Sequence, residues 1–179
     1  MQRIQDEVDA LDHTPSYAEL TPPTETLPVL NAFISEVLRL HPAVPSEVIE
    51  CVSTEPLVMP DGCIVQPRDK ILWAPLVMAQ SPRIWGPDAR TFDPGRFISG
   101  DPRAAAANKK TAYEWPVFNA GPRSCLGKNL ARAEIAFVCV EVLRAFDLEM
   151  GWNGGEKEIG PGLTNPIKGG LPVLATKRT

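Results

Sequence analysis

The chain has 179 residues, 18 of them basic and 22 acidic, a formal net charge of −4 at pH 7 and 44% hydrophobic residues. These values are typical of a globular protein with one buried core, and the absence of a basic run argues against a nucleic-acid partner. No apolar run approaches the roughly 20 residues that a membrane-spanning helix needs, and no signal peptide is visible. We therefore expect no anchor in this chain and reduced cysteines.

The first predicted helix covers residues 1–12, because apolar residues recur at helical spacing at Ile4, Val8 and Leu11. A proline-rich connection is expected over residues 13–26. A second helix is predicted over residues 27–40, with Thr26 as its cap and Pro28 in its first turn. Apolar residues cover most faces of this helix, so we expect it to be buried on most sides; they are Leu30, Phe33, Ile34, Val37, Leu38 and Leu40.

The middle of the chain is expected to hold short strands and then a long irregular segment. Strand-like runs fill residues 47–77, with turns at 60–62 and 67–69, and residues 70–77 predict a buried strand. One helical turn is expected over Ser81–Trp85. Residues 86–117 lack periodicity, the alanine run 104–107 included, and a stretch of that length needs specific contacts to be ordered.

One cysteine, Cys125, lies in the run Phe-Asn-Ala-Gly-Pro-Arg-Ser-Cys-Leu-Gly that ends at Gly127. Gly121 and Gly127 leave room for a close approach, and Arg123 offers a charge for an anionic group. A helix predicted to follow at once would favour a thiolate through its N-terminal dipole. The other cysteines, Cys51, Cys63 and Cys139, form no Cys-x-x-Cys pair with it, so a structural zinc site is not expected.

The helix after Cys125 is predicted to run to Ala145. Its inward face is expected to hold Leu130, Phe137, Val138 and Val142. The residues expected to face water are Lys128, Arg132 and Arg144. The remaining tail predicts short β-pieces, of which Leu171–Ala175 is the last strand.

The spacing Phe118-x-x-Gly121-x-Arg123-x-Cys125-x-Gly127 resembles the cytochrome P-450 family, the haem-thiolate monooxygenases, in its eukaryotic, microsomal type. The resemblance implies that Cys125 is the axial ligand of the iron of haem b, a thiolate that favours O–O cleavage. It also implies that Phe118 packs beside the ligand loop, Arg123 pairs with a haem propionate, and Gly121 and Gly127 allow the porphyrin to lie close.

A second motif strengthens this resemblance. Glu36 and Arg39 lie three apart on the second predicted helix and share a face; on an exposed helix they would be an ordinary surface pair. By resemblance they form a buried triad with Arg96, in Phe-Asp-Pro-Gly-Arg-Phe, that pins the irregular segment beneath the haem. The fold implied is mainly α with small β-sheets: residues 1–179 would be the C-terminal haem-binding portion of a single P-450 domain, with the N-terminal portion absent.

Two positions depart from the family pattern. Gly95 stands where a glutamate usually precedes the triad arginine, and Ile49 stands where an arginine often binds the second propionate. The distal helix with its acid–alcohol pair has no counterpart in this sequence. Two segments, 44–49 and 163–167, would touch substrate in a complete enzyme; for the second, an ordinary surface loop is an equal alternative.

The family implies insertion of one oxygen atom of dioxygen into an organic, lipophilic substrate, with electrons from an NADPH-dependent reductase for which Lys128 and Arg132 are candidate contacts. A full-length relative would reside at the endoplasmic reticulum membrane; the location of this chain is left open. The alternative is a truncated, catalytically inactive haem-binding remnant. A cysteine-nucleophile hydrolase is disfavoured, because neither His13 nor His41 is placed to act as its base.

Overall fold

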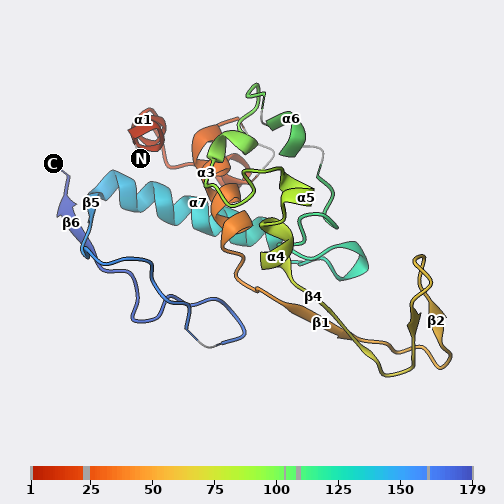
Figure 1. The fold of residues 1–179 in the computed structure, drawn as a ribbon. Helices are drawn as coiled ribbons and strands as arrows, with labels where there is room; N and C mark the ends of the chain where they lie inside the picture. Colours follow the sequence, from red (N-terminus) through yellow and green to blue (C-terminus); the bar gives the residue numbers. More distant parts are fainter. Residues whose placement is uncertain (1, 22–24, 103, 108–109, 161, 179) are drawn as a thin grey trace.

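The computed structural model describes residues 2–21, 25–102, 104–107, 110–160 and 162–178, so parts of the predicted 1–12, 13–26 and 86–117 segments lie outside the described residues. Among these described residues helices dominate, and three separate two-stranded sheets accompany them. In Figure 1 the long helix α7 (Lys128–Ala145) runs across the middle of the molecule, and the β-strands extend from the helical body as narrow ribbons. The predicted class, mainly α with small sheets, agrees with this arrangement.

The main core lies among helices α1 (Gln2–Asp9), α3 (Pro28–Leu40) and α7, which contact one another in pairs. Its members include fully buried side chains from each helix and from Leu27, the residue before α3: Val8, Leu27, Leu30, Ala136 and Val140. The predicted second helix is therefore confirmed as α3. Burial of apolar side chains of this size stabilises the fold by about 1.5–3 kcal/mol each.

The N-terminus of α3 is capped from a distance. Thr26 was the expected cap, but the N-cap position is Leu27. The half-buried carboxylate of Glu7 on α1 accepts the backbone N–H groups of Val29 at 2.9 Å and Leu30 at 2.8 Å. A carboxylate at a helix N-terminus satisfies free N–H groups and complements the helix dipole, so Glu7 joins α1 to α3.

The sequence predicts a proline-rich connection over residues 13–26. Among its described residues, the short helix α2 covers Tyr17–Leu20. Ser16 begins it with a capping box, in which its backbone N–H and hydroxyl both donate to Glu19, at 2.8 and 2.7 Å. These hydrogen bonds lower the pKa of Glu19 to about 2. Local capping chemistry thus stabilises a helix that has too few apolar residues for a periodicity to reveal it.

Strands β1 (Glu47–Glu50) and β4 (Lys70–Trp73) pair antiparallel, and β2 (Leu57–Val58) pairs with β3 (Ile64–Val65) in a hairpin that projects from the body in Figure 1. The buried strand predicted over 70–77 is confirmed as a strand only for residues 70–73, and its predicted burial is wrong. Strand β4 ends at Trp73 with Leu72 exposed, and helix α4 (Pro75–Ala79) follows. Pro75 lacks an N–H for the ladder and suits the first turn of a helix.

Helix α5 (Pro82–Trp85) confirms the expected helical turn, and the long segment after it is ordered around a small aromatic cluster. Trp115 packs edge-on against Trp85, at 6.0 Å between ring centroids, and against Phe97 at 5.1 Å. This segment also forms the 3₁₀ turn η1 (Pro94–Phe97) and helix α6 (Ala104–Ala107), where a loop was expected. Aromatic packing therefore orders backbone that has no periodic signal of its own.

The buried face of α7 differs from the prediction. The side chains that face the core are Arg132, Ala133, Ala136, Val140 and Leu143. Leu130, Phe137 and Val138 are exposed, and Val142 is half-buried. Small residues at Ala133 and Ala136 face the core, and three of the four apolar residues predicted to face inward are exposed. Arg132, expected in water, is only 7% exposed.

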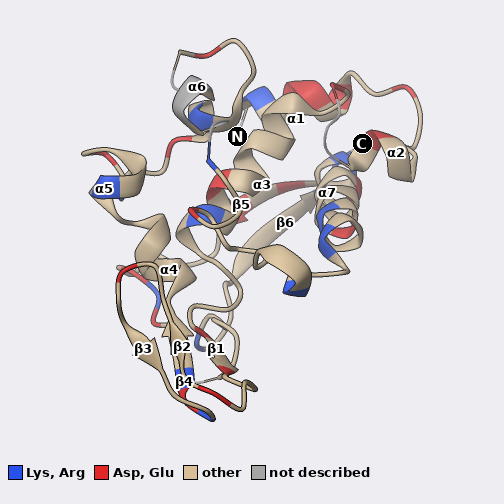
Figure 2. Cartoon of the chain, turned by 90° about the vertical axis from the view of Figure 1, so that its right-hand side faces the viewer, with Lys and Arg blue, Asp and Glu red and all other residues tan. Residues whose placement is uncertain are grey.

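The C-terminal strand β6 (Val173–Lys177) starts two residues later than predicted and pairs antiparallel with β5 (Phe146–Met150). Arg178 then binds Asp9 through two hydrogen bonds, at 2.8 and 3.0 Å, which fastens the end of the chain to α1. Figure 2 shows Lys and Arg scattered among acidic residues over several elements. Within the part of the chain that is described, no helix has the length and apolarity to cross a membrane.

Candidate functional site

A buried ion pair joins two residues of α3. The guanidinium of Arg39 donates to both carboxylate oxygens of Glu36, from Nε to Oε2 at 2.7 Å and from Nη2 to Oε1 at 2.8 Å. Both side chains are 0% exposed. A buried pair of this kind offsets its desolvation only when the remaining donors and acceptors are also satisfied.

Backbone groups of the following segments complete that hydrogen bonding. Arg39 donates from Nη1 to the carbonyls of Ala79 and Ala89, both at 2.6 Å, and from Nη2 to the carbonyl of Thr91 at 3.2 Å. The indole of Trp85 lies 5.0 Å from the Arg39 Cζ. The side chain of Arg39 therefore binds three carbonyl groups of the 79–91 backbone at once.

Arg96 on η1 enters the same cluster. Its Nε lies 3.7 Å from Glu36 Oε1, beyond hydrogen-bond distance, and its Nη2 contacts Asp88 Oδ2 at 2.6 Å and the Asp88 carbonyl at 2.9 Å. The structure thus brings together Glu36, Arg39 and Arg96, the three residues that the family resemblance grouped. It adds Asp88, whose half-exposed carboxylate supplies a second negative charge against the two arginines.

Asp88 and Asp93 were missed in the sequence analysis. The backbone N–H of Asp93 donates to Glu36 Oε1 at 2.7 Å, and the Asp93 side chain accepts the N–H of Gly95 at 3.0 Å. The signal that could have found both is an aspartate beside proline, in Gly86-Pro87-Asp88 and Asp93-Pro94, where such residues stabilise turns. Gly95 is buried beside Arg96.

The loop that carries Cys125 is held by its own backbone. The Cys125 N–H donates to the Phe118 carbonyl at 2.8 Å, and the Ser124 N–H donates to the Gly121 carbonyl at 3.1 Å. Asn119 and Gly121 have positive φ angles of 60° and 69°, which Asn and Gly tolerate best. A side chain at Gly121 would also press on Tyr113 Oη, 3.2 Å from the position of a Cβ.

Helix α7 begins at Lys128, three residues after Cys125 rather than at once, with Gly127 as its N-cap. The loop residues from Gly121 to Leu126 are exposed. A Cβ at Gly127 would meet only the Cys125 Sγ, at 4.0 Å, so open space lies beside the thiol. The exposed side chains of Leu126 and Leu130 add an apolar surface next to the cysteine.

Cys125 and its surroundings suit an iron ion that is already bound by a macrocycle. Among the described residues, no three His, Cys, Asp or Glu side chains gather as a metal site, so Cys125 would act as a single protein ligand. Arg123 is exposed and has no ion pair within the described part of the chain. The site fits a flat, apolar cofactor that carries carboxylates. It offers the accessible thiol of Cys125, the open space at Gly127 and the exposed guanidinium of Arg123.

Comparison with known families decides the identity of this arrangement. A family described as Cytochrome P-450 matches residues 1–172. The chain belongs to the cytochrome P-450 family. Its members are haem-thiolate oxidoreductases of the monooxygenase class, so the resemblance seen in the cysteine loop is confirmed at the level of the family.

Three relatives of this P-450 chain come from plants. It is 34% identical to an alkane hydroxylase, MAH1, of Arabidopsis thaliana over 86% of the chain and 30% of the relative. It is 35% identical to a noroxomaritidine synthase of a Narcissus over 84% of the chain and 28% of the relative, and 32% identical to a cytochrome P-450 of Helianthus annuus over 83% and 92%. The chain thus spans about a third of the first two relatives.

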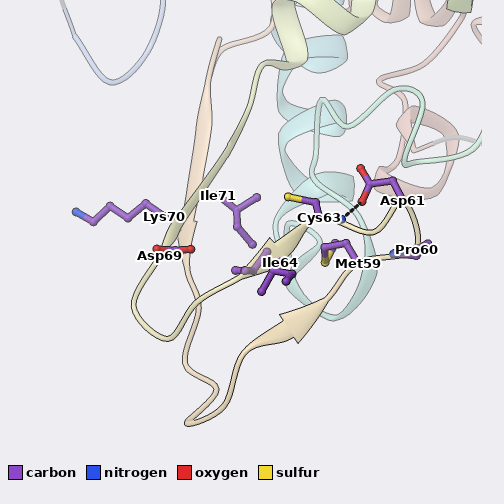
Figure 3. Close-up of a pocket in the computed structure, with 9 residues that line it drawn as sticks. Met59, Pro60, Asp61, Cys63, Ile64, Asp69, Lys70 and Ile71 are labelled. Carbon is purple, nitrogen blue, oxygen red and sulfur yellow. Dashed lines mark hydrogen bonds between the residues drawn. The ribbon is translucent and has the colours of Figure 1, made fainter.

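A hollow of about 600 Å³ lies beside the β2–β3 hairpin rather than at the cysteine loop of this P-450 chain. Figure 3 shows Met59, Ile64 and Ile71 along it, with Asp61 accepting the Cys63 N–H at 3.0 Å. It is a shallow surface between exposed strands, and none of its lining residues belongs to the loop or to the buried arginine cluster.

Proposed function

We propose that this chain forms the thiolate side of the haem site of a monooxygenase, as the C-terminal haem-binding portion, residues 1–179, of a P-450 domain. The observation that carries the proposal is the exposed Cys125 thiol in a loop whose spacing matches the family. Haem b, when bound, supplies the activation of dioxygen for insertion of one oxygen atom into an organic substrate. Cys125 is proposed as the axial ligand of its iron.

The other loop residues have separate tasks in this proposal. Arg123 neutralises a haem propionate, because its guanidinium is exposed and free of ion pairs among the described residues. Gly127 leaves the space beside the thiol clear. Phe118 fixes the loop, since its carbonyl accepts the Cys125 N–H. Gly121 makes the turn that a residue with a side chain would strain.

Glu36, Arg39 and Arg96 are proposed to act structurally. Their hydrogen bonds hold the backbone between Ala79 and Asp93 against α3, and the aromatic cluster of Trp85 and Trp115 links that backbone to the residues before the cysteine loop. The triad would thereby position the loop without touching the haem.

The substrate is proposed to be lipophilic, in line with an alkane hydroxylase among the relatives. Electrons would come from an NADPH-dependent reductase, and dioxygen is the second substrate. Lys128 is exposed and remains a candidate reductase contact, whereas Arg132 is buried and is withdrawn from that role. The endoplasmic reticulum membrane is the proposed site of the full-length enzyme.

The test is the carbon-monoxide difference spectrum of the reduced, haem-supplemented chain. We expect the red-shifted band of a thiolate ligand, its loss in Cys125→Ser, and its retention in Cys63→Ser, which removes another exposed thiol. A band that survives Cys125→Ser would contradict the assignment. Dioxygen consumption with a reductase then separates an active portion from an inactive haem-binding chain.

A further inference from the structure

A second pocket lies beneath the cysteine loop, between residues 110–119 and the first turns of α7. It measures about 210 Å³, the share of roughly seven liquid waters. Its polar lining is basic or neutral: Lys110, Thr111, Trp115, Asn119, Lys128 and Arg132. No carboxylate lines it among the described residues. The three cationic side chains of this lining favour an anion over a cation.

Arg132 is the deepest charge in this pocket. Its side chain is 7% exposed, and its Nη2 donates to Ser35 Oγ on α3 at 2.9 Å, while its Nε has no partner in the described structure. Burial lowers the pKa of the Arg132 guanidinium. Buried charges are almost always paired, and Arg39 and Arg96, which are at least as buried, both face Glu36. Arg132 faces a neutral hydroxyl instead.

A second unused donor is part of the same lining. The Trp115 Nε1 is buried and has no partner in the part of the chain that is described. An indole N–H can only donate, as can a guanidinium N–H, so both need an acceptor. Both residues line this pocket, and an oxyanion can accept from several donors at once.

Lysines provide further charge around these donors. The Lys128 Nζ lies 6.0 Å from the centre of the Phe118 ring and is otherwise exposed. Lys110 is partly neutralised, because Glu114 Oε1 lies 3.4 Å from its Nζ. Glu114 also accepts the Thr111 N–H at 2.9 Å, and this bond contributes most to lowering the pKa of its carboxyl. After that pairing, Lys128 and Arg132 remain to balance a ligand.

We propose that this pocket binds a phosphate-type oxyanion, with Arg132 and Trp115 as buried donors and Lys128 as the cation at its rim. The ligand is recognised by its charge and its acceptor-only oxygens. The site is separate from the proposed iron ligand Cys125, which does not line it. The inference does not depend on haem.

Isothermal titration calorimetry of the whole chain with inorganic phosphate, at constant ionic strength, tests the proposal. We expect saturable binding, weakened roughly tenfold by Trp115→Phe, which keeps a ring and removes one N–H, and by Arg132→Gln. Lys128→Gln, a change at an exposed side chain that leaves the fold intact, should weaken binding about fivefold.

Lys157→Gln is the matched control, because Lys157 also lies over an aromatic ring, 5.0 Å from the centre of Trp152, but outside the pocket. It should bind phosphate like the parent chain. Glycerol 3-phosphate distinguishes the two sources of the bound phosphate group. If it binds as tightly as inorganic phosphate, the ligand is a phosphate group of a larger molecule. If it does not bind, the ligand is free phosphate. The proposal is overturned if phosphate fails to bind, or if Trp115→Phe and Lys128→Gln bind it unchanged.

Discussion

Glu36 on α3 accepts a hydrogen bond from the backbone N–H of Asp93, 57 residues further along the chain, at 2.7 Å. The same carboxylate is bound by Arg39 through two hydrogen bonds and faces Arg96. A single buried anion therefore ties a regular helix to an irregular segment. Removing it leaves two buried cations and a free backbone donor, so this cluster is stable only as a unit.

Glu36→Ala should lower the free energy of unfolding by about 3–5 kcal/mol, because it leaves Arg39 buried and unpaired. It should also abolish haem incorporation, if the cysteine loop depends on the triad. Urea unfolding and haem content measure the two effects. Glu141→Ala is the control: it removes a surface partner 3.9 Å from Arg144 and should cost about 0–1 kcal/mol. Normal haem content in Glu36→Ala would contradict the structural role.

The cap supplied by Glu7 can be tested separately from the core. Glu7→Ala should destabilise the chain by about 1 kcal/mol, since it frees the N–H groups of Val29 and Leu30 at the start of α3. Urea unfolding followed by circular dichroism measures the loss. Glu156→Ala, at an exposed position in the tail, should leave stability unchanged. Equal effects of the two variants would show that the cap contributes nothing.

The ion pair of Asp88 with Arg96 predicts that the folded chain loses stability in acid. The hydrogen bond from Arg96 is the main cause that lowers the pKa of Asp88 below its ordinary value of 3.8. The pKa of Asp88 is lower in the folded than in the unfolded chain, so its ionised carboxylate stabilises the fold fully at pH values above the unfolded-state pKa. This stabilisation is lost as the pH falls through the folded-state pKa. Urea midpoints between pH 6 and 3 should therefore fall less steeply in Asp88→Asn than in the parent, measured in parallel. Parallel curves for the two proteins would refute this role.

The four free cysteines should differ in reactivity. Cys63 and Cys125 are exposed, Cys51 is buried, and Cys139 is half-buried with a thiol pKa raised by burial. A chromogenic disulfide reagent should therefore modify two thiols rapidly in the folded chain without haem. Cys125→Ser should remove one fast thiol, and Cys139→Ser should remove none. A third fast thiol in the parent that Cys139→Ser removes would mean that α7 does not pack as described.

Short-range signals in the sequence determined helix α3, the turns at 60–62 and 67–69, the helical turn at α5 and the spacing of the cysteine loop. Each depends on periodicity, on glycine and proline, or on residues within one turn, which act locally. Glu36 and Arg39 are three residues apart on one helix, so their pairing could be predicted as well. Arg96 was placed with them only through the family resemblance.

Tertiary structure alone decided which face of α7 is buried. Its apolar residues favoured a face with Leu130 and Phe137, but the helix packs through Ala133 and Ala136, and Arg132 donates to Ser35, 97 residues away. The cap from Glu7 and the contacts of Asp88 and Trp115 depend in the same way on which segments meet in space. Local sequence specifies backbone conformation, whereas the partner of a buried charge is set by packing between distant segments, which no local pattern contains.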